Sequence, residues 1–327
     1  MRSNDNTVMM RACTGAPGML LAVVLWAVMS VTGIHDGPPA IAESGGTLLP
    51  APGSWGLHPA LSCLLGMLLA AGCAIALWLL NKTFNFLSGP GAIFSAIFLI
   101  ACGATPDMSD SLSPGLIVAA VALWGTCLLF GLYGRRRATS QCLLLFSLLS
   151  WGSMVQQACL MLAPVFLAGL VLLRVGRPRE FIASLIGLVT PYWIVLGLGI
   201  ASPGELNFSA PRMIAYLEGD PSRFVWTIIS AGVTTFIFVM LVLYNSLHTL
   251  SAGVKMRACL SFVNLLGGGC IAWMLFDCCD FTAYFATLYM CMGLVVTRTF
   301  ELSRSPRAWV LPACIAATYI ILYCLHD

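Results

Sequence analysis

Long hydrophobic runs separated by short polar joints dominate this chain from Pro17 to Leu325. A helix of roughly 20 apolar residues crosses the hydrocarbon core of a bilayer, where every backbone N–H and C=O must pair within the protein. The pattern therefore predicts an all-α, polytopic transmembrane helix bundle that forms a single integral membrane domain over residues 1–327. Eleven spans are predicted, at 17–33, 59–80, 90–104, 114–134, 139–153, 157–174, 181–201, 224–247, 258–276, 281–298 and 308–325.

Charged residues divide the joints into two alternating sets. One set holds fourteen of the sixteen Lys and Arg residues, whereas the other holds ten of the thirteen acids and only two cations, Arg212 and Arg223. Lys and Arg are enriched in the cytoplasmic joints of membrane proteins. The chain is therefore predicted to start inside, with residues 1–16 as a cytoplasmic tail, and to end outside. Its two longest joints, 34–58 and 202–223, then lie on the outer face, where such loops are more often functional than connective.

The stretch 139–174 is ambiguous by hydrophobicity alone, because it fits either a hairpin of two short helices or one long, broken span. Charge decides between the two. A basic cluster at Arg135–Arg137 precedes the stretch, and a second one at Arg174–Arg179 follows it. Both clusters belong on the same side of the membrane, so the chain is expected to cross twice between them.

The first hydrophobic run has two interpretations. Arg11, the apolar stretch and Ala40-Ile41-Ala42 resemble a signal peptide with a small-residue cleavage site. The run 17–33 is long for the apolar part of such a peptide, and nine residues with two prolines separate it from the end of that site. Retention as a first span is therefore preferred. Cleavage of residues 1–42 would leave ten spans and would change no later orientation.

Composition excludes several classes of protein. The chain is 59% hydrophobic and 9% charged, which is incompatible with a soluble domain. Its basic clusters are short, lie next to the membrane and lack interleaved aromatic residues, so a nucleic-acid partner is not expected. The fourteen cysteines form no C-x-x-C pair and the four histidines are scattered, so no cofactor is evident from them. A divalent metal is not excluded, because the acids described next include carboxylates that can bind one.

Asp36 directly follows the first span. A carboxylate at the outer end of a helix can act as a general base or bind a metal, so Asp36 is the candidate catalytic residue. The alternative is a solvated loop acid. Asp107 and Asp110 form a D-x-x-D pair, which suits Mg²⁺ or Mn²⁺ because hard cations prefer oxygen ligands. These two acids fit equally well as helix-capping residues ahead of Ser113-Pro114.

Arg212 and Arg223 are not explained by topology, because they are cations on an acidic face. A guanidinium group binds phosphate through two parallel hydrogen bonds, and a lipid-linked pyrophosphate at the outer leaflet would be a suitable ligand. Both arginines are therefore candidate phosphate-binding residues. Pairing with Glu218 or Asp220 in the same loop is an equally good interpretation.

Other polar positions have ordinary structural roles by default. Gln156, Gln157, Asn245 and Asn264 are expected to form hydrogen bonds between helices. A transporter would instead predict that Gln156, Asn245 and Asn264 line a polar cavity at the midplane. The pair Cys278-Cys279, between two acids at a polar joint, is expected to be inert packing, with a redox or metal role as the alternative.

Two short segments resemble a known family. The joint from Leu80 to Asn85 matches an L-N-x-x-x-N pattern, and residues 173–192 match L-R-x-x-x-x-R-E followed by G-L-x-T-P-Y. The chain thus resembles an uncharacterised family of multi-pass inner-membrane proteins of Bacteroidetes, and the likeness extends over most of the chain from about Ala60. The resemblance implies a bacterial inner-membrane location. It assigns no catalytic residue, because the family has no established activity.

The architecture is also similar to that of polyprenyl-phosphate-dependent integral-membrane glycosyltransferases, which carry an acid in the first outer loop. This resemblance implies that Asp36 would activate an acceptor hydroxyl while Arg212 or Arg223 holds the leaving phosphate. It is a likeness of fold, and fold alone does not define function.

Three functions follow from these features. The preferred one is an accessory or scaffold component of cell-envelope assembly, because every polar feature has an adequate structural explanation. The alternatives are an outer-face glycosyltransferase or glycan polymerase that uses a lipid-linked sugar donor, and a transporter. Membrane lipids are the expected partners in each case, with a polyprenyl-phosphate-linked glycan or an envelope-assembly complex as further candidates.

Overall fold

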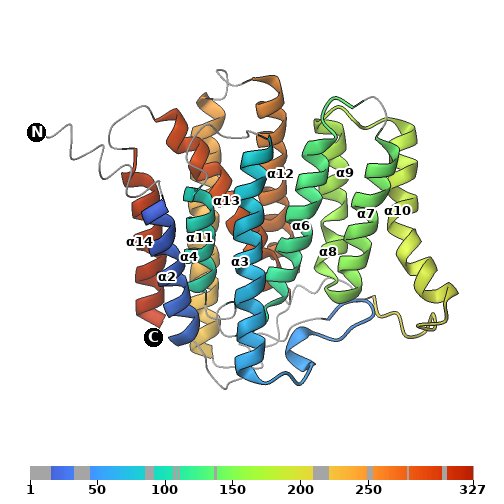
Figure 1. Ribbon diagram of the computed structural model, residues 1–327, viewed down its shortest axis with the longest axis horizontal. Helices are drawn as coiled ribbons and strands as arrows, with labels where there is room; N and C mark the ends of the chain where they lie inside the picture. The colour runs from blue at the N-terminus through green and yellow to red at the C-terminus, as the bar shows by residue number, and fades with distance from the viewer. Residues whose placement is uncertain are drawn as a thin grey trace, which may run out of the picture.

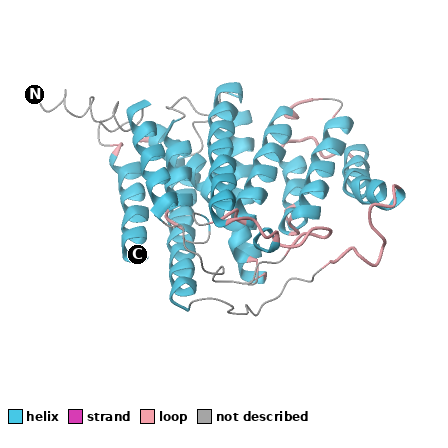
Figure 2. Ribbon diagram, turned by 60° about the horizontal axis from the view of Figure 1, so that its bottom comes forward, coloured by secondary structure: helices cyan, strands magenta, loops and turns pink. Residues whose placement is uncertain are grey.

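The computed structural model is a bundle of helices, and no strand occurs in the ranges that it describes (Figures 1 and 2). These ranges are 16–32, 45–84, 92–105, 108, 111–135, 138–208, 221–248, 253–277, 280–303 and 308–326. The helices are α2 (Ala16–Thr32), α3 (Pro59–Phe84), α4 (Ala92–Gly103), α6 (Pro114–Gly131), α7 (Thr139–Val155), α8 (Ala158–Met161), α9 (Ala163–Leu172), α10 (Pro178–Gly197), α11 (Pro221–His248), α12 (Val254–Phe276), α13 (Phe281–Leu302) and α14 (Val310–His326), with a short 3₁₀ turn η1 (Pro52–Ser54).

Every hydrophobic run of the sequence forms a helix. Pro59, Pro114, Pro178 and Pro221 each begin one, because proline lacks the N–H that is unpaired in the first turn of a helix. Ser113 caps α6 by accepting a hydrogen bond from the N–H of Gly115 at 3.2 Å. The predicted all-α fold is therefore confirmed.

Six helices are long and apolar enough to cross a membrane: α3, α6, α10, α11, α12 and α13. The shorter apolar segments are 17–32, 92–103, 139–155, 158–172 and 310–325. From α10 to α13, successive long helices run in opposite directions across the bundle, whereas α3 and α6 run in the same direction with the short α4 between them (Figure 1). These six helices confirm the prediction of a multi-pass membrane protein.

The helical hairpin predicted over 139–174 is present. The arm α7 ends where Gln156 leaves helical geometry, at φ −144° and ψ 115°, and α8 and α9 form the returning arm. Close packing joins α7 to α10. The Ser147 hydroxyl donates to the Gly187 carbonyl at 3.1 Å, and a Cβ on Gly187 would lie 2.5 Å from the Leu143 carbonyl oxygen. Only glycine permits this approach of the two backbones.

The centre of the bundle is α13. Its most apolar 18-residue window is entirely buried, although it is the least apolar of the six long helices. It packs against α4, α6, α11 and α12. In a lipid environment, helices that face the bilayer are apolar on their outer side, whereas polar side chains are placed inside the protein. The position of α13 follows from this rule.

The described charges are sorted between the two ends of the bundle (Figure 1). The end where α3 finishes and α12 begins, here the basic end, holds every Lys and Arg whose side chain is described: Lys82, Arg135, Arg174, Arg177, Arg179, Lys255, Arg257 and Arg298. Glu180 and Glu301 also lie there. The opposite end, here the acidic end, holds Glu205, Asp277 and Asp280. The alternation of charge along the sequence thus corresponds to opposite ends of the structure.

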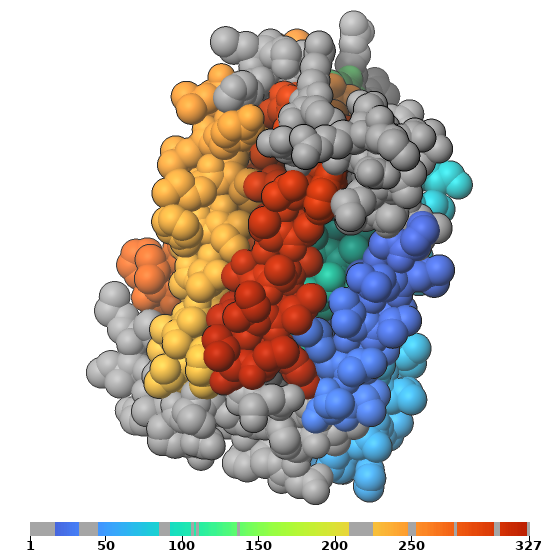
Figure 3. Space-filling view, turned by 90° about the vertical axis from the view of Figure 1, so that its left-hand side faces the viewer, coloured from blue at the N-terminus to red at the C-terminus, as the bar shows by residue number. Residues whose placement is uncertain are grey.

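Two apolar grooves interrupt the sides of the bundle. One, of about 440 Å³, lies between α2 and α14 with α4 as its floor, and Figure 3 shows α4 between these two helices. A contact of 2.5 Å between the hydroxyls of Thr32 and Tyr323 joins α2 to α14. The other groove, of about 630 Å³, lies between α11 and α12.

Candidate functional site

Two buried acids lie where the chain turns from α12 into α13. Asp277 ends α12, and its N–H donates to the Trp273 carbonyl at 2.7 Å. Asp280 occupies the N-cap position of α13, and its carbonyl accepts from the N–H of Ala283 at 2.9 Å. The Asp280 carboxylate makes no capping hydrogen bond, so it serves another interaction. The two side chains are 7% and 6% exposed, an unusual degree of burial for carboxylates.

Tyr284 lies one turn into α13, next to both acids. Its hydroxyl is buried and has no hydrogen-bond partner among the described residues. The charges of Asp277 and Asp280 act on this side chain electrostatically.

Gln156 follows α7 at the same end of the bundle. Its backbone carbonyl accepts the N–H of Cys159 at 3.1 Å. Gln156 is completely buried, yet neither its amide nitrogen nor its amide oxygen has a partner in the described part of the chain. Leaving a buried polar group unpaired costs about 1–3 kcal/mol. Asp277, Asp280, Tyr284 and Gln156 are here called the acidic-end cluster. Each buried polar group without a partner needs an explanation, and a bound ligand or water is one.

Residues 45–50 cover the neighbouring end of α7, and we call them the strap. The N–H of Thr47 donates to the Ser153 carbonyl at 2.9 Å, and the N–H of Leu49 donates to the Met154 carbonyl at 3.0 Å. A Cβ on Gly46 would lie 2.1 Å from the same Met154 oxygen, so only glycine fits there. The helix α7 has 17 residues and is therefore only about 25 Å long, which is shorter than a hydrocarbon core of about 30 Å. Irregular backbone that follows it at membrane depth must form its hydrogen bonds with other parts of the protein. The strap provides that pairing.

A second polar network crosses the middle of the bundle and is bonded throughout. The Tyr289 hydroxyl lies 2.7 Å from the Thr105 hydroxyl and 3.3 Å from that of Ser230. The Thr234 hydroxyl lies 2.7 Å from that of Tyr319. These contacts join α11, α13 and α14 to the end of α4, and fastening helices together is a sufficient role for them.

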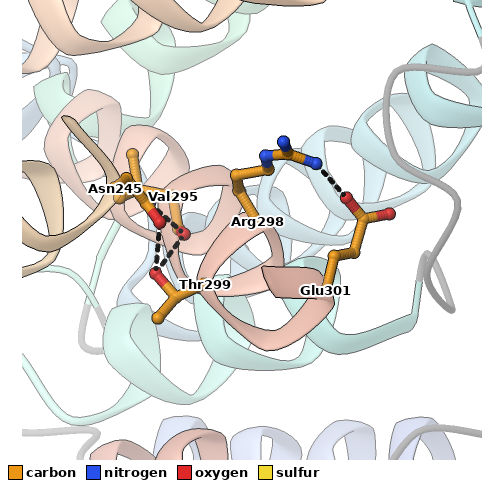
Figure 4. A network of polar contacts seen from close by, with 5 residues as sticks. All are labelled: Asn245, Val295, Arg298, Thr299 and Glu301. Carbon is orange, nitrogen blue, oxygen red and sulfur yellow. Dashed lines mark hydrogen bonds and ion pairs between the residues drawn. The ribbon is translucent and has the colours of Figure 1, made fainter. Parts of the chain in front are cut away.

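The basic end of α13 holds a third network (Figure 4). The amide nitrogen of Asn245 donates to the Val295 carbonyl at 3.1 Å, and the Thr299 hydroxyl donates to the Asn245 amide oxygen at 3.1 Å. One turn of the helix away, Arg298 and Glu301 form an ion pair at 3.0 Å. The predicted interhelical role of Asn245 is confirmed. Asn245 and Gln156 lie at opposite ends of the bundle, so they do not share a midplane cavity.

The groove between α11 and α12 reaches the acidic end of the bundle. Its lining is mostly apolar and includes Ile228, Ile271, Leu275 and Phe281. Leu275 lies two residues before Asp277, and Phe281 directly follows Asp280, but neither acid lines the groove. The groove and the two acids are therefore neighbours along the chain, and they are the candidate functional features of this end.

Most residues proposed from the sequence lie outside the described ranges. This applies to Asp36, Asp107, Asp110, Arg212 and the pair Cys278-Cys279. Arg223 falls in the first turn of α11, at the acidic end, and its side chain is likewise not described. Their convergence on one outer cleft stays a prediction. Within the described ranges, no group of three or more His, Cys, Asp and Glu residues is placed to hold a metal.

Sequence reasoning did not single out Asp277, Asp280 and Tyr284. The two acids entered it only as neighbours of the cysteine pair. A usable signal was present, because both acids stand in one short joint between two hydrophobic runs, with a tyrosine one turn into the second run.

The fold and the site together define a helical multi-pass membrane protein with an acidic polar cluster at one end. Comparisons with family models, with curated proteins and with solved structures find no match to the chain. The resemblance to inner-membrane proteins of Bacteroidetes therefore stays a prediction.

Proposed function

We propose that this chain is a protein of the bacterial inner membrane that crosses it eleven times, with the N-terminus inside and the C-terminus outside. The sorting of charge between the two ends of the bundle is the observation that carries this proposal, because cytoplasmic joints are enriched in Lys and Arg. The shorter apolar helices complete the crossings, since each lies beside a long helix of opposite direction.

We further propose that it serves cell-envelope assembly as an accessory component that presents its acidic end to other envelope factors. Support comes from the ordered surface of that end. Trp55 and Phe208 are 37% and 56% exposed there, and Phe208 packs against Tyr192 with ring centroids 5.7 Å apart. The strap holds this surface in place through the hydrogen bond from Asn207 N–H to the Thr47 carbonyl at 2.9 Å. Exposed aromatic side chains on rigid backbone are typical of contact surfaces.

Reporter fusions test the orientation. Alkaline phosphatase, which is active only outside the cytoplasm, and green fluorescent protein, which fluoresces when fused inside, are placed after Arg135, Gly176, Glu205 and His326. We expect fluorescence at the first two sites and phosphatase activity at the last two. The reverse pattern would refute the inside start, and equal signals after Arg135 and Glu205 would refute the crossings between them.

An outer-face glycosyltransferase or glycan polymerase is the second candidate. A specific observation favours it, because the α11–α12 groove could hold the chain of a lipid-linked donor while its polar end meets Asp277 and Asp280. In this scheme Asp36 acts as base, and Arg212 and Arg223 bind phosphate. The acids Asp107 and Asp110 would hold any divalent metal.

Gene deletion followed by profiling of cell-surface glycans tests this candidate. We expect altered glycans in the deletion strain, restoration by the unaltered chain, and no restoration by Asp36→Ala or Arg212→Ala. If the deletion leaves the glycans unchanged, the transferase is ruled out while the accessory role remains testable by the growth and envelope integrity of the same strain.

A further inference from the structure

We infer that the side of α10 that faces away from α7, together with the turn that joins α9 to α10, forms a binding site for an anionic phospholipid of the inner leaflet. Arg174 and Arg179 hold the headgroup phosphate, and an acyl chain lies in an apolar hollow on α10. This inference goes beyond the proposed function and depends on it only for the choice of leaflet.

The hollow lies at the edge of the bundle. Helix α10 packs against α7 on one side and is the outermost helix of its end of the view (Figure 1). On the side away from α7, a hollow of about 400 Å³ is lined by Leu185, Ile186, Val189, Thr190 and Trp193. Val189 and Trp193 are 58% and 75% exposed. The hollow is therefore open to the acyl chains of a surrounding bilayer.

Arg179 stands in line with this hollow. An α-helix has 3.6 residues per turn, so Ile186 and Trp193 lie on the same stripe of α10 as Arg179. A rise of about 1.5 Å per residue places Leu185 about 9 Å and Trp193 about 21 Å from Arg179 along the helix axis. One leaflet is about 15 Å deep, which is half of a hydrocarbon core of about 30 Å. A phosphate at Arg179 therefore places the end of its acyl chain in the hollow.

The position of Arg179 does not serve the stability of its helix. It is exposed in the first turn of α10, where a cation is disfavoured because the N-terminus of a helix carries partial positive charge. The neighbouring acid, Glu180, is only 3% exposed and does not offer its charge to the surface. Arg177 adds positive charge to the turn, although it takes part in an interaction of its own. The turn thus presents cations to its surroundings.

Arg174 also occupies an unfavourable position. Among the residues that the structure describes, it is the one non-glycine residue with a positive φ, at 59°. It ends α9 in a Schellman turn, in which the N–H of Val175 donates to the Leu170 carbonyl at 2.9 Å. Glycine is the usual residue here, because the left-handed region is strained for residues that carry a Cβ. Retention of this strain for an exposed side chain indicates that the side chain acts outside the protein.

The two arginines belong to one short turn. Gly176 brings the end of α9 against the start of α10, since Val171 and Phe181 each have an atom 3.2 Å from the place of a Cβ on Gly176. An inside location of this turn requires cations, but it does not require them at these two positions. A guanidinium binds phosphate well, and a molecule with both a phosphate and a hydrocarbon chain matches cations that stand above an apolar hollow. An acidic protein segment would match the cations but not the hollow.

Native mass spectrometry of the full-length protein in detergent micelles tests the site. The probes are phosphatidylglycerol and phosphatidylcholine with identical acyl chains, offered in equal amounts. The free headgroup glycerophosphoglycerol and a polyglutamate peptide are added separately as competitors. We expect the phosphatidylglycerol adduct to exceed the phosphatidylcholine adduct by about fivefold or more, as the attraction of each arginine for an anionic lipid predicts. Neither competitor should displace the lipid, because neither has an acyl chain.

Two arginine variants locate the headgroup. Arg174→Gly places the usual residue at the left-handed position, and Arg179→Gln removes a cation from a helix N-terminus, so neither should lower thermal stability. Each should reduce the preference for phosphatidylglycerol by about fivefold. Arg257→Gln is the matched control, because Arg257 is an exposed arginine near the start of α12, at the same basic end but away from α10. It should leave the preference unchanged.

A pair of tryptophan variants tests the hollow. Val189→Trp fills it and should reduce retention of both lipids by about threefold, comparable to the loss of one buried methylene. Val24→Trp is the matched control, because Val24 is 61% exposed and lies on α2 at the other side of the bundle. Thermal stability of both variants is measured alongside, and unchanged values attribute the loss to the hollow.

Several outcomes would overturn the inference. Equal retention of the two lipids by the unaltered protein refutes the anionic specificity, and an equal loss with Arg257→Gln assigns that specificity to the net charge of the basic end. Displacement by glycerophosphoglycerol assigns the arginines to a soluble phosphate compound, and displacement by polyglutamate assigns them to an acidic protein. Equal retention by Val189→Trp and Val24→Trp refutes the hollow. Binding in micelles does not depend on which way the protein faces, so failure of this experiment is distinguishable from failure of the fusion experiment.

Discussion

The two ends of α13 carry polar clusters of similar size that are built differently. At the basic end, Asn245 uses both amide atoms to bond the backbone and side chains of α13, and Arg298 is paired with Glu301. At the acidic end, the Tyr284 hydroxyl and the whole Gln156 amide are buried with no partner among the described residues. The basic end also holds single buried atoms without a partner among the described residues, in Gln141, Glu180, Arg298 and Trp309. The two ends therefore differ in degree, because Gln156 at the acidic end has a partner for neither of its amide atoms.

The difference shows how to separate structural polarity from functional polarity inside a membrane protein. Interhelical hydrogen bonds stabilise a bundle modestly, and partnered groups need no further explanation. Unpartnered groups lower stability, so their retention requires a ligand or a partner that pairs with them. By this criterion the whole amide of Gln156 stands out, because Arg298 in the basic-end network still bonds Glu301 although its Nε lacks a partner among the described residues.

The largest expected effect concerns the strap, which covers only the acidic end. Gly46→Ala places a methyl group against the Met154 carbonyl, and backbone on both sides cannot move away easily. We expect a loss of about 3 kcal/mol in the free energy of unfolding, at the upper end for overpacked sites. Unfolding by dodecyl sulfate in mixed micelles measures the change. Gly204→Ala is the matched control, because it adds the same methyl in a loop at the acidic end where nothing lies within 4 Å. Equal effects of the two variants would mean that the strap does not hold this end.

A matched pair of amide deletions compares the two ends directly. Asn245→Leu removes two hydrogen bonds at the basic end, and we expect it to lower the free energy of unfolding by about 2 kcal/mol. Gln156→Leu removes an amide without partners at the acidic end, so it should leave stability unchanged or raise it by about 1 kcal/mol. The same unfolding assay measures both. A large loss with Gln156→Leu would show that the amide has a structural partner and would remove the distinction between the ends.

The helices were predictable because hydrophobic run length is a local property. Each run of roughly 15–24 apolar residues must be helical in lipid, so its position follows from sequence alone. The hairpin at 139–174 required charge as well, since its two arms are continuous in hydrophobicity. The break between α8 and α9 was not predicted. Pro164 causes it, because proline lacks the N–H that would bond within the helix.

The central position of α13 and the acidic-end cluster were not predicted. Membrane-spanning helices look alike in sequence when every face is apolar. The periodicity of apolar residues therefore does not show which helix is surrounded by the others. A weaker signal existed, since α13 contains Thr282, Tyr284, Thr287 and Tyr289, and such a polar content favours the interior. The cluster itself depends on how the end of α7 lies relative to α12 and α13 in space. No local pattern records that arrangement.

Two tyrosines on α13 allow the two kinds of polar group to be compared by removing a single hydroxyl from each. Tyr289→Phe removes the contacts to Thr105 and Ser230, and we expect a loss of about 1 kcal/mol. Tyr284→Phe removes a hydroxyl without a partner among the described residues, so the unfolding free energy should not fall. If Tyr284→Phe destabilises the protein as much as Tyr289→Phe, the Tyr284 hydroxyl is structural.

The smallest expected effect is at the ion pair of the basic end. Glu301→Gln removes the charge but keeps an oxygen that can accept from Arg298, and the pair lies in the last turns of α13, near the water phase. We expect a loss of about 0.5 kcal/mol, because the amide oxygen still accepts from Arg298, and little dependence on salt, because the two side chains are only 11% and 10% exposed. Asp280→Asn is the matching change at the acidic end, where the residue is 6% exposed and takes part in an interaction of its own. Equal losses of stability in the two variants would make the acidic end a second structural joint, and the contrast between the two ends of α13 would then reflect packing alone.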